Sequence, residues 1–244
     1  MEFNRTGALP PAGRDLLSGG ALLLDLDGTL LDIAARPDAV SVPPSMVTDL
    51  GILSMKLNGA LGIITGRRLD DVDALLTPLR LPIAAEHGGV LRPFPNEPAW
   101  ALPRPHLPHG WMQTARVFTG QHPGLLLEAK TGGFVIHYRQ APEQAGACLN
   151  LMRGLVAGDP EFEILRASMA WELRPRGVHK GIGLRALMDV PPFAGRKPWF
   201  IGDDVTDEDA IEAAEALGGR GFRMAEHFGA PATLRAWLGA LHGA

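Results

Sequence analysis

The sequence predicts an α/β fold built on a parallel sheet, and three observations support this prediction. Three short hydrophobic runs, "ALLLD", "LGIIT" and "WFIGD", end at Asp25, Thr65 and Asp203. Continuous runs of this length are typical of strands that are buried on both faces, as in a parallel sheet. A turn residue and a helical pattern follow each run, which indicates repeated strand–helix units. Each run also ends on a polar residue, and the carboxyl ends of parallel strands form the edge where α/β proteins bind ligands.

The composition favours a globular protein with a large core. The chain has 244 residues, of which 46% are hydrophobic, enough for one large domain or one domain with an insertion. Its apolar runs are too short to cross a membrane, and the first twenty residues lack the pattern of a signal peptide, so we expect a cytoplasmic protein. The single cysteine, Cys148, excludes an internal disulfide. The net charge of −4, with acids and bases mixed, gives no basic stripe for nucleic acid.

The remaining strands and helices of the sheet follow in order. "PIAAEHG" from Pro82 and "GRGFRM" from Gly219 are predicted as two further strands. "TGRRLDDVDALLTPL" is predicted as a helix that starts immediately after Thr65, with its first amide groups beside the sheet edge. The helix in "VTDEDAIEAAEALGG" is predicted to have Thr206 as its N-cap and to stop at Gly218 and Gly219.

The middle of the chain changes character. The segment "RPFPNEPAWALPRPHLPHG" is rich in proline, which suits an extended crossing between domains and excludes a helix or a central strand. We therefore expect a core domain at 1–104 and 175–244, interrupted by an inserted cap domain at 105–174.

The predicted insertion has its own pattern of elements. A helix at 111–118 precedes the hairpin "LLLEAKTGGFVIHYR", which turns at Gly132 and Gly133. A second helix at 142–156 precedes a second hairpin, "FEILRASMAWELRP". This order describes a small α+β domain with its helices on one side of the sheet.

Four short segments carry a family resemblance: "DLDGTL" at 25–30, "ITGR" at 64–67, "HKG" at 179–181 and "GDDVTDED" at 202–209. Each alone has an ordinary structural explanation, such as a capped turn, a helix start or a surface lysine. In this order, and with an insertion between the second and third, they resemble the signature segments of the haloacid-dehalogenase-like phosphatases. The resemblance implies a Rossmann-like parallel-sheet core with an inserted α+β cap.

The chemistry of phosphoryl transfer explains the first pair of acids. The reaction needs an in-line nucleophile, a proton donor for the leaving oxygen and positive charge on the equatorial oxygens. Asp25 can act as the nucleophile and form an aspartyl phosphate. Asp27 can protonate the leaving alkoxide and then deprotonate the water that hydrolyses the intermediate. In the superfamily, an acid at the position of Asp27 distinguishes phosphatases from members without a proton donor.

Like charges at this spacing need a cation. Mg²⁺ prefers oxygen ligands in octahedral geometry, so we expect it to bind Asp25, the backbone carbonyl of Asp27, and Asp203. Asp204 and Asp207 are expected to support the ion through water or to orient Lys180.

Several groups are expected to bind the phosphoryl oxygens. They are the Thr65 hydroxyl, the Gly66 amide and the Lys180 ammonium, with Arg67 as a further substrate-binding residue. His87 in "AEHGG" lies at a predicted strand end, where it either borders the pocket or is an ordinary loop histidine.

The cap is expected to recognise the leaving group. Strand alternation places Glu128 and Lys130 on one face of the first hairpin, and Glu172 lies in the second. Such acids and bases suit a ligand rich in hydroxyls, because a carboxylate accepts sugar O–H bonds and a lysine donates. The alternative is a solvated face with a simple ion pair.

A closer resemblance covers most of the chain, from Leu22 to Phe222. "AEHGG", "LLLEAKTGGFVIHYR", "WELRPRGVHKG" and "FIGDDVTDEDA" resemble the trehalose-6-phosphate phosphatases. The resemblance implies hydrolysis of trehalose 6-phosphate to trehalose and phosphate, with Glu128, Lys130 and Glu172 holding the glucose units. His179 stands where these proteins often have asparagine or serine.

Three other functions remain open from the sequence. A capped phosphatase for another sugar phosphate, such as a sucrose or mannosyl phosphate, would share every core residue. A non-catalytic sugar-phosphate sensor is a second alternative, although it would not need Asp27. A phosphomutase would pass the phosphoryl group to a second sugar phosphate. We expect a monomer, because the chain has no coiled-coil pattern or long apolar surface helix.

Overall fold

The computed structural model describes residues 14–34 and 39–241 and divides them into two compact units. Unit 1 comprises the described residues of Met1–Leu102 and His179–Ala244, and unit 2 comprises Pro103–Val178. The chain therefore leaves unit 1 after Leu102 and returns to it at His179. Within the two described stretches, no helix is long and apolar enough to cross a membrane.

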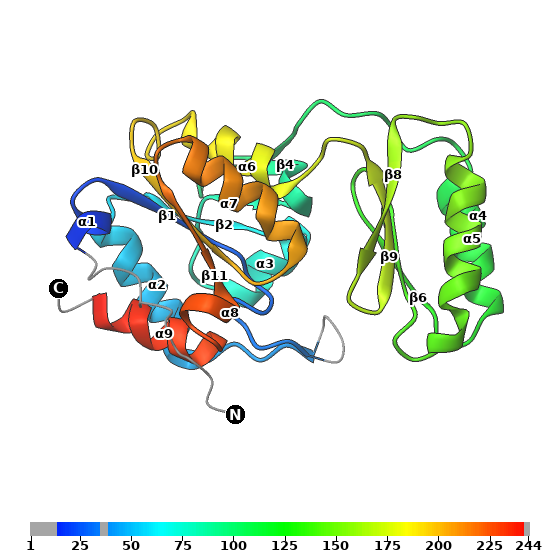
Figure 1. Ribbon diagram of the computed structural model, residues 1–244, viewed down its shortest axis with the longest axis horizontal. Helices are drawn as coiled ribbons and strands as arrows, with labels where there is room; N and C mark the ends of the chain where they lie inside the picture. The colour runs from blue at the N-terminus through cyan, green and yellow to red at the C-terminus, as the bar shows by residue number, and fades with distance from the viewer. Residues whose placement is uncertain (1–13, 35–38, 242–244) are drawn as a thin grey trace. The chain divides into compact units, whose positions relative to one another are not determined.

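Unit 1 is built on a seven-stranded sheet (Figure 1). Its strands, in spatial order, are β11 (Arg220–Arg223), β10 (Lys197–Gly202), β1 (Gly20–Leu24), β2 (Leu61–Ile64), β3 (Ile83–Ala85), β4 (Val90–Arg92) and β5 (Trp100–Ala101). The first five strands are parallel to one another, while β4 and β5 join antiparallel at one edge.

Burial explains why the hydrophobic runs form the centre of this sheet. Every residue of β1 and β2 is buried. A parallel strand that is covered by helices on both faces cannot alternate between apolar and polar side chains, so it appears in the sequence as a continuous apolar run. The prediction of an α/β fold with a parallel central sheet is confirmed.

Helices cover both faces of this sheet. They are α1 (Arg14–Leu17), α2 (Pro44–Lys56), α3 (Leu69–Leu76), α6 (Lys180–Met188), α7 (Glu208–Ala216), α8 (Met224–His227) and α9 (Pro231–Ala240), with the 3₁₀ turns η2 (Glu86–Gly88) and η4 (Val205–Asp207). Figure 1 shows α6 and α7 on one side of the sheet and α2 and α9 on the other.

Two predicted helix starts are wrong. Helix α3 begins at Leu69, not immediately after Thr65, because the intervening residues form a turn in which the Arg67 backbone N–H donates to Oγ1 of Thr65 at 3.1 Å. Thr206 is not the N-cap of α7. Instead, Asp204 caps the 3₁₀ turn η4, where its Oδ1 accepts from the Thr206 backbone N–H at 2.7 Å, and α7 begins at Glu208.

Unit 2 is a four-stranded antiparallel sheet with helices on one face (Figure 1). Its elements in chain order are α4 (Trp111–Gln121), β6 (Leu126–Ala129), β7 (Phe134–His137), η3 (Pro142–Gln144), α5 (Ala145–Val156), β8 (Phe162–Ala167) and β9 (Ala170–Pro175). The spatial order of the strands is β6-β7-β9-β8.

The two faces of this sheet differ in polarity. Phe134, Ile136 and Leu173 pack in one hydrophobic cluster with Cys148 and Met152 of α5. Because side chains alternate along a strand, the residues between them project from the other face. That second face, which the helices do not cover, is called here the polar face of unit 2.

An ion pair between a buried arginine and a partly exposed aspartate attaches helix α3 to the antiparallel edge of the unit 1 sheet. Arg92, at the end of β4, is only 2% exposed, and its Nη1 and Nη2 atoms donate to the Asp73 carboxylate at 2.5 and 2.6 Å. These hydrogen bonds, with help from Arg80, lower the pKa of Asp73 despite its partial burial. The pair thus holds the helix that follows the Thr65–Arg67 turn.

Replacing Asp73 by Ala should lower the free energy of unfolding by about 2 kcal/mol, because it leaves a buried guanidinium without its carboxylate. Asp71→Ala, which changes an exposed acid of the same helix, should cost much less. The measurement is urea unfolding across pH. Since the Asp73 pKa is lowered in the folded chain, the difference between wild type and Asp73→Ala should shrink below about pH 4. A constant difference down to pH 2 would contradict this account.

Candidate active site

The ends of three neighbouring parallel strands place polar residues at one edge of the unit 1 sheet. Asp25 follows β1, Thr65 follows β2 and Asp203 follows β10. Since β1 pairs in parallel with both β2 and β10, the three residues lie at the same carboxyl edge. Lys180, the first residue of α6, also belongs to unit 1 and reaches this edge.

Lys180 connects two buried carboxylates. Its Nζ atom lies 2.7 Å from Oδ1 of Asp25 and 2.6 Å from Oδ1 of Asp207. The side chains of all three residues are at most 5% exposed. Burial alone would lower the pKa of Lys180, but the charges of Asp25 and Asp207 raise it above its usual value. The ammonium group therefore stays charged at neutral pH.

Asp207 is held in place from its other side. Its Oδ2 atom accepts hydrogen bonds from the backbone N–H groups of Asp203 and Asp204 at 2.9 and 3.1 Å. A side chain on Gly202 would overlap the Asp207 carboxylate, so glycine is needed there. Asp207 thus fixes the position of the Lys180 ammonium relative to Asp25.

The described residues contain an acidic group that fits a metal ion. Carboxylate oxygens of Asp25, Asp203 and Asp207 all lie within 4.8 Å of one another. Gly28, at φ +79°, leaves room for the Asp203 carboxylate, which a Cβ at this position would overlap. An all-oxygen donor set of this kind suits a hard cation such as Mg²⁺ or Ca²⁺.

The electrostatics of this group indicate excess negative charge. Burial, reinforced by the charges of Asp207 and Asp203, raises the pKa of Asp25 well above its usual value even though Lys180 opposes the shift. Burial and the charges of Asp207 and Asp204 raise the pKa of Asp203 to about 6. A bound cation would relieve this repulsion.

The carboxylates of Asp27 and Asp204 have other partners. Asp27 accepts two hydrogen bonds from Arg67, from Nε to Oδ2 at 2.6 Å and from Nη2 to Oδ1 at 2.7 Å. Asp204 is exposed and uses its carboxylate to cap η4. The structure therefore brings Asp203 and Asp207, but not the side chains of Asp27 and Asp204, into the acidic group with Asp25.

The turn after β2 packs against η2. The backbone N–H groups of His87 and Glu86 donate to the carbonyls of Thr65 and Arg67, each at 2.9 Å. A Cβ on Gly66 would lie 2.6 Å from Nε2 of His87, so the imidazole ring lies directly against this glycine. His87 thus adjoins the predicted phosphate-binding turn.

Two polar residues of interest were missed by sequence reasoning. Thr29 is fully buried, and its Oγ1 donates to Oδ1 of Asp203 at 3.4 Å. Its place in the "DLDGTL" segment could have suggested it. His137 lies in unit 2, and its Nε2 is 2.8 Å from Oε2 of Glu128. Strand alternation from Glu128 across the hairpin could have found it, because the two lie on the same face.

The polar face of unit 2 carries the predicted sugar-binding residues. Glu128 pairs across the sheet with Val135, which in turn pairs with Glu172, so the two acids lie in one row. Lys130 forms an ion pair with Oε1 of Glu128. Burial would raise the pKa of Glu128, but the hydrogen bond from His137 and the charge of Lys130 lower it to about 2.

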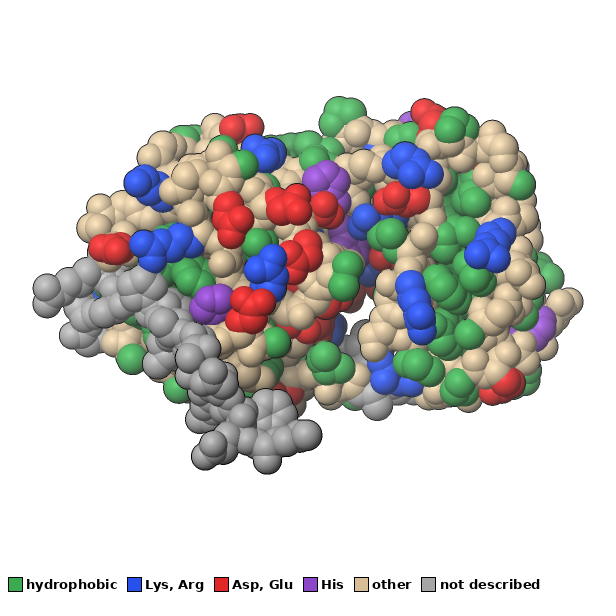
Figure 2. Space-filling view, in the orientation of Figure 1, with side chains coloured by type: hydrophobic (Ala, Val, Ile, Leu, Met, Phe, Trp, Pro, Cys, Tyr) green, Lys and Arg blue, Asp and Glu red, His purple; other side chains and the backbone are tan. Residues whose placement is uncertain are grey.

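Helix α7, which follows η4, carries acidic side chains on its exposed surface. Figure 2 shows acidic side chains gathered over α7, where Asp209, Glu212 and Glu215 are exposed. These acids would repel an anion, whereas the Lys180 ammonium at the site itself would attract one.

In the metal-free protein, Asp203→Asn should raise the free energy of unfolding at pH 7 by roughly 1 kcal/mol, because it removes one of the crowded charges. Wild-type protein should become more stable as the pH falls from 7 to 5, since folded Asp203 takes up a proton near pH 6 whereas an unfolded Asp does so near pH 4. Added Mg²⁺ should raise the melting temperature of the wild type more than that of Asp203→Asn. Thermal melts in chelator and in Mg²⁺ test this, and equal metal responses would count against the site.

The chain matches known proteins over most of its length. A family model described as trehalose-phosphatase matches residues 23–227. The chain is 40% identical over 209 residues to a probable trehalose-phosphate phosphatase of Sinorhizobium fredii, an alignment that covers 85% of this chain and 78% of that protein. It is 36% identical over 221 residues to the trehalose-6-phosphate phosphatase of Escherichia coli, covering 89% of this chain and 80% of that one.

A solved structure shares the fold. The C-terminal domain of the trehalose-6-phosphate phosphatase of C. albicans superposes with a TM-score of 0.78 at 21% identity and covers 99% of both chains. The structural likeness supports the fold. The family model, whose match at residues 23–227 spans all four signature segments, and the two sequence relatives support the family. The chain therefore belongs to the trehalose-phosphatase family.

Proposed function

We propose that this protein hydrolyses trehalose 6-phosphate to trehalose and phosphate through an aspartyl phosphate on Asp25. The observation that carries the proposal is the Asp25–Lys180–Asp207 contact at the carboxyl edge of the parallel sheet. It places an oriented carboxylate beside a buried cation, within a chain that matches the trehalose-phosphatase family over most of its length.

In the first step, an oxygen of Asp25 attacks phosphorus and the bond to the sugar oxygen breaks. The Lys180 ammonium favours the ionised form of Asp25 and orients it for the attack, and the charge of a bound cation would favour that form further. Asp27 gives a proton to the departing sugar oxygen, so that trehalose leaves as an alcohol. Arg67 holds both oxygens of Asp27 in this structure, so this pairing has to open before Asp27 can carry the proton that it donates.

In the second step, water attacks the phosphorus of the aspartyl phosphate. Asp27, now ionised, accepts a proton from this water, and the bond between phosphorus and the Asp25 oxygen breaks. Inorganic phosphate leaves and the Asp25 carboxylate is restored. The same residue thus serves as acid and then as base, which needs no further proton carrier.

We propose that Mg²⁺ binds at Asp25, Asp203 and the backbone carbonyl of Asp27. When bound, the ion supplies positive charge that offsets the crowded carboxylates and the phosphoryl oxygens. Asp207 and Asp204 support this site indirectly. Asp207 orients Lys180, and Asp204 caps the turn that carries Asp207.

The phosphoryl oxygens are held by the Thr65 hydroxyl, the Gly66 amide and Lys180. The contact between Gly66 and His87 keeps this turn in place, so His87 shapes the site. Arg67 becomes a further phosphate ligand if its pairing with Asp27 relaxes during binding.

Unit 2 is proposed to be the cap domain that selects the sugar. The polar face of its sheet presents Glu128, Lys130 and Glu172, whose carboxylates accept from sugar hydroxyls while the ammonium donates to them. Phosphatases for other sugar phosphates would share the unit 1 groups, so the choice of trehalose rests on these residues and on the family match.

We expect phosphate release to require Mg²⁺ and to prefer trehalose 6-phosphate strongly. The compounds to compare with it are sucrose 6-phosphate, glucose 6-phosphate and an aryl phosphate. The reason is that unit 1 binds any phosphate, whereas the sugar contacts add binding energy only for the correct leaving group. One phosphate should form for each trehalose, which separates hydrolysis from transfer to a second sugar. Preference for another sugar phosphate would contradict the substrate assignment, and absence of release from every compound would contradict the enzyme.

A further inference from the structure

One residue of the polar face of unit 2 has no role in the mechanism above. His137 ends β7, next to Leu126 of β6 on one side and Ala170 of β9 on the other. It lies two residues after Val135, which stands between Glu128 and Glu172 in the adjacent row. Alternation along β7 therefore places His137 on the same face as both acids.

The contact of His137 with Glu128 is directional. Its Nε2 lies 2.8 Å from Oε2 of Glu128, while Lys130 contacts the other oxygen, Oε1. The pKa of Glu128, at about 2, means that this carboxylate is ionised and can only accept hydrogen bonds. His137 must therefore donate from Nε2, and the carboxylate is held at both oxygens.

His137 is not part of the hydrophobic cluster under the sheet. That cluster lies on the helical face and includes the neighbours of His137 in sequence, Ile136 and Tyr138. The His137 side chain is 21% exposed and the Glu128 side chain 26% exposed. A polar pair in this position can meet a ligand, and a core-packing role does not account for it.

We propose that His137 is a positioning residue for sugar recognition, which holds Oε2 of Glu128 so that the carboxylate keeps the orientation needed to accept sugar hydroxyls. This inference rests on the proposed function and deepens it. Each carboxylate oxygen has two lone pairs, so one from each remains available when His137 and Lys130 occupy the others.

Without His137, Lys130 is the remaining charged partner that the structure gives to Glu128. The carboxylate is then able to rotate about its last torsion and to bring both oxygens toward the ammonium, which is the stronger donor. Sugar binding would have to order the carboxylate again and to compete with the lysine. The loss should therefore appear in binding of the sugar and not in the chemical step.

The test uses the 244-residue chain with Asp25→Asn, which cannot form the aspartyl phosphate, and titrates trehalose 6-phosphate in Mg²⁺ by calorimetry. Adding His137→Ala should weaken binding about tenfold. Adding His137→Gln should restore most of the affinity, because the glutamine amide can donate from nearly the same position as Nε2.

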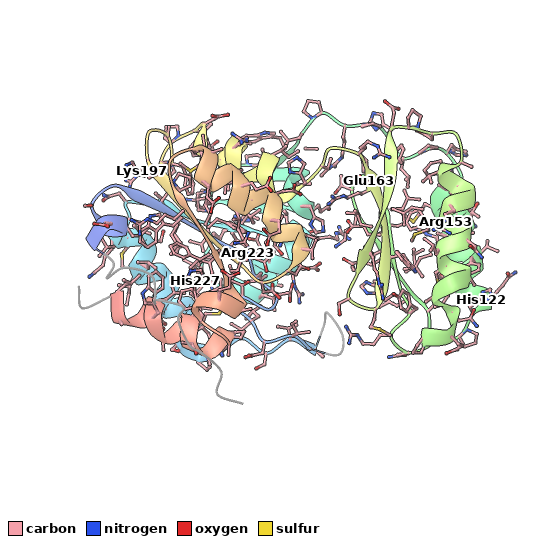
Figure 3. All side chains as sticks on the ribbon, in the orientation of Figure 1. His122, Arg153, Glu163, Lys197, Arg223 and His227 are labelled. Carbon is pink, nitrogen blue, oxygen red and sulfur yellow. The ribbon has the colours of Figure 1, made fainter. Side chains whose placement is uncertain are left out.

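His122→Ala is the matched control. This histidine belongs to the same unit but lies at the end of α4, on the helical side of the sheet (Figure 3). Its ring stacks on Phe118. Its replacement should leave the affinity for trehalose 6-phosphate unchanged.

Two kinetic measurements separate positioning from a structural role. With Asp25 intact, His137→Ala should raise KM for trehalose 6-phosphate while leaving kcat, and all constants for a small aryl phosphate, nearly unchanged. In a Glu128→Gln background, His137→Ala should cause little further loss, because its partner has already changed.

Equal affinity of the parent and His137→Ala chains would overturn the inference, as would the same tenfold loss in the Glu128→Gln background. A loss on both substrates that His137→Gln does not restore would indicate a structural role and also overturn it. If the Asp25→Asn parent itself fails to bind trehalose 6-phosphate, the proposed function falls together with this inference, whereas the other outcomes leave that function intact.

Discussion

The contact of the Lys180 ammonium with Asp25 and Asp207 is the interaction on which the site depends. Two carboxylates that are at most 5% exposed would be costly side by side, and one buried cation between them offsets part of this cost. The contact also joins the end of β1, the start of α6 and the turn η4. The same charge that stabilises this part of the fold therefore orients the proposed nucleophile.

The two units offer different chemical groups for binding. Unit 1 supplies cations, amide groups and an acidic group, which suit a phosphoryl group and a metal ion but say nothing about the leaving group. The polar face of unit 2 supplies the carboxylates of Glu128 and Glu172, which lie in one row of the sheet, and the Lys130 ammonium, which contacts Glu128. Such groups suit hydroxyls. His137 adds order to this face, because a carboxylate that is already oriented loses less entropy when a sugar binds.

The sequence predicts much of the fold because buried parallel strands leave continuous apolar runs, and because Asp25, Thr65, Lys180 and Asp203 stand in recognisable segments. The sequence predicts poorly which side chains contact one another. The pattern of "TGRR" does not show that a turn delays the helix until Leu69, nor that Arg67 binds Asp27. The run "GDDVTDED" does not show which acid caps the turn and which meets Lys180, because those choices depend on backbone geometry that charge spacing leaves open.

The most direct test of this account is to trap the phosphorylated protein. Wild-type chain mixed with trehalose 6-phosphate and Mg²⁺, quenched in acid within a turnover and digested, should give a peptide with phosphate on Asp25, as read by mass spectrometry. The Asp25→Asn chain should give none and should release no phosphate. Phosphate on another residue, or steady phosphate release by Asp25→Asn, would contradict the assignment of Asp25 as the nucleophile.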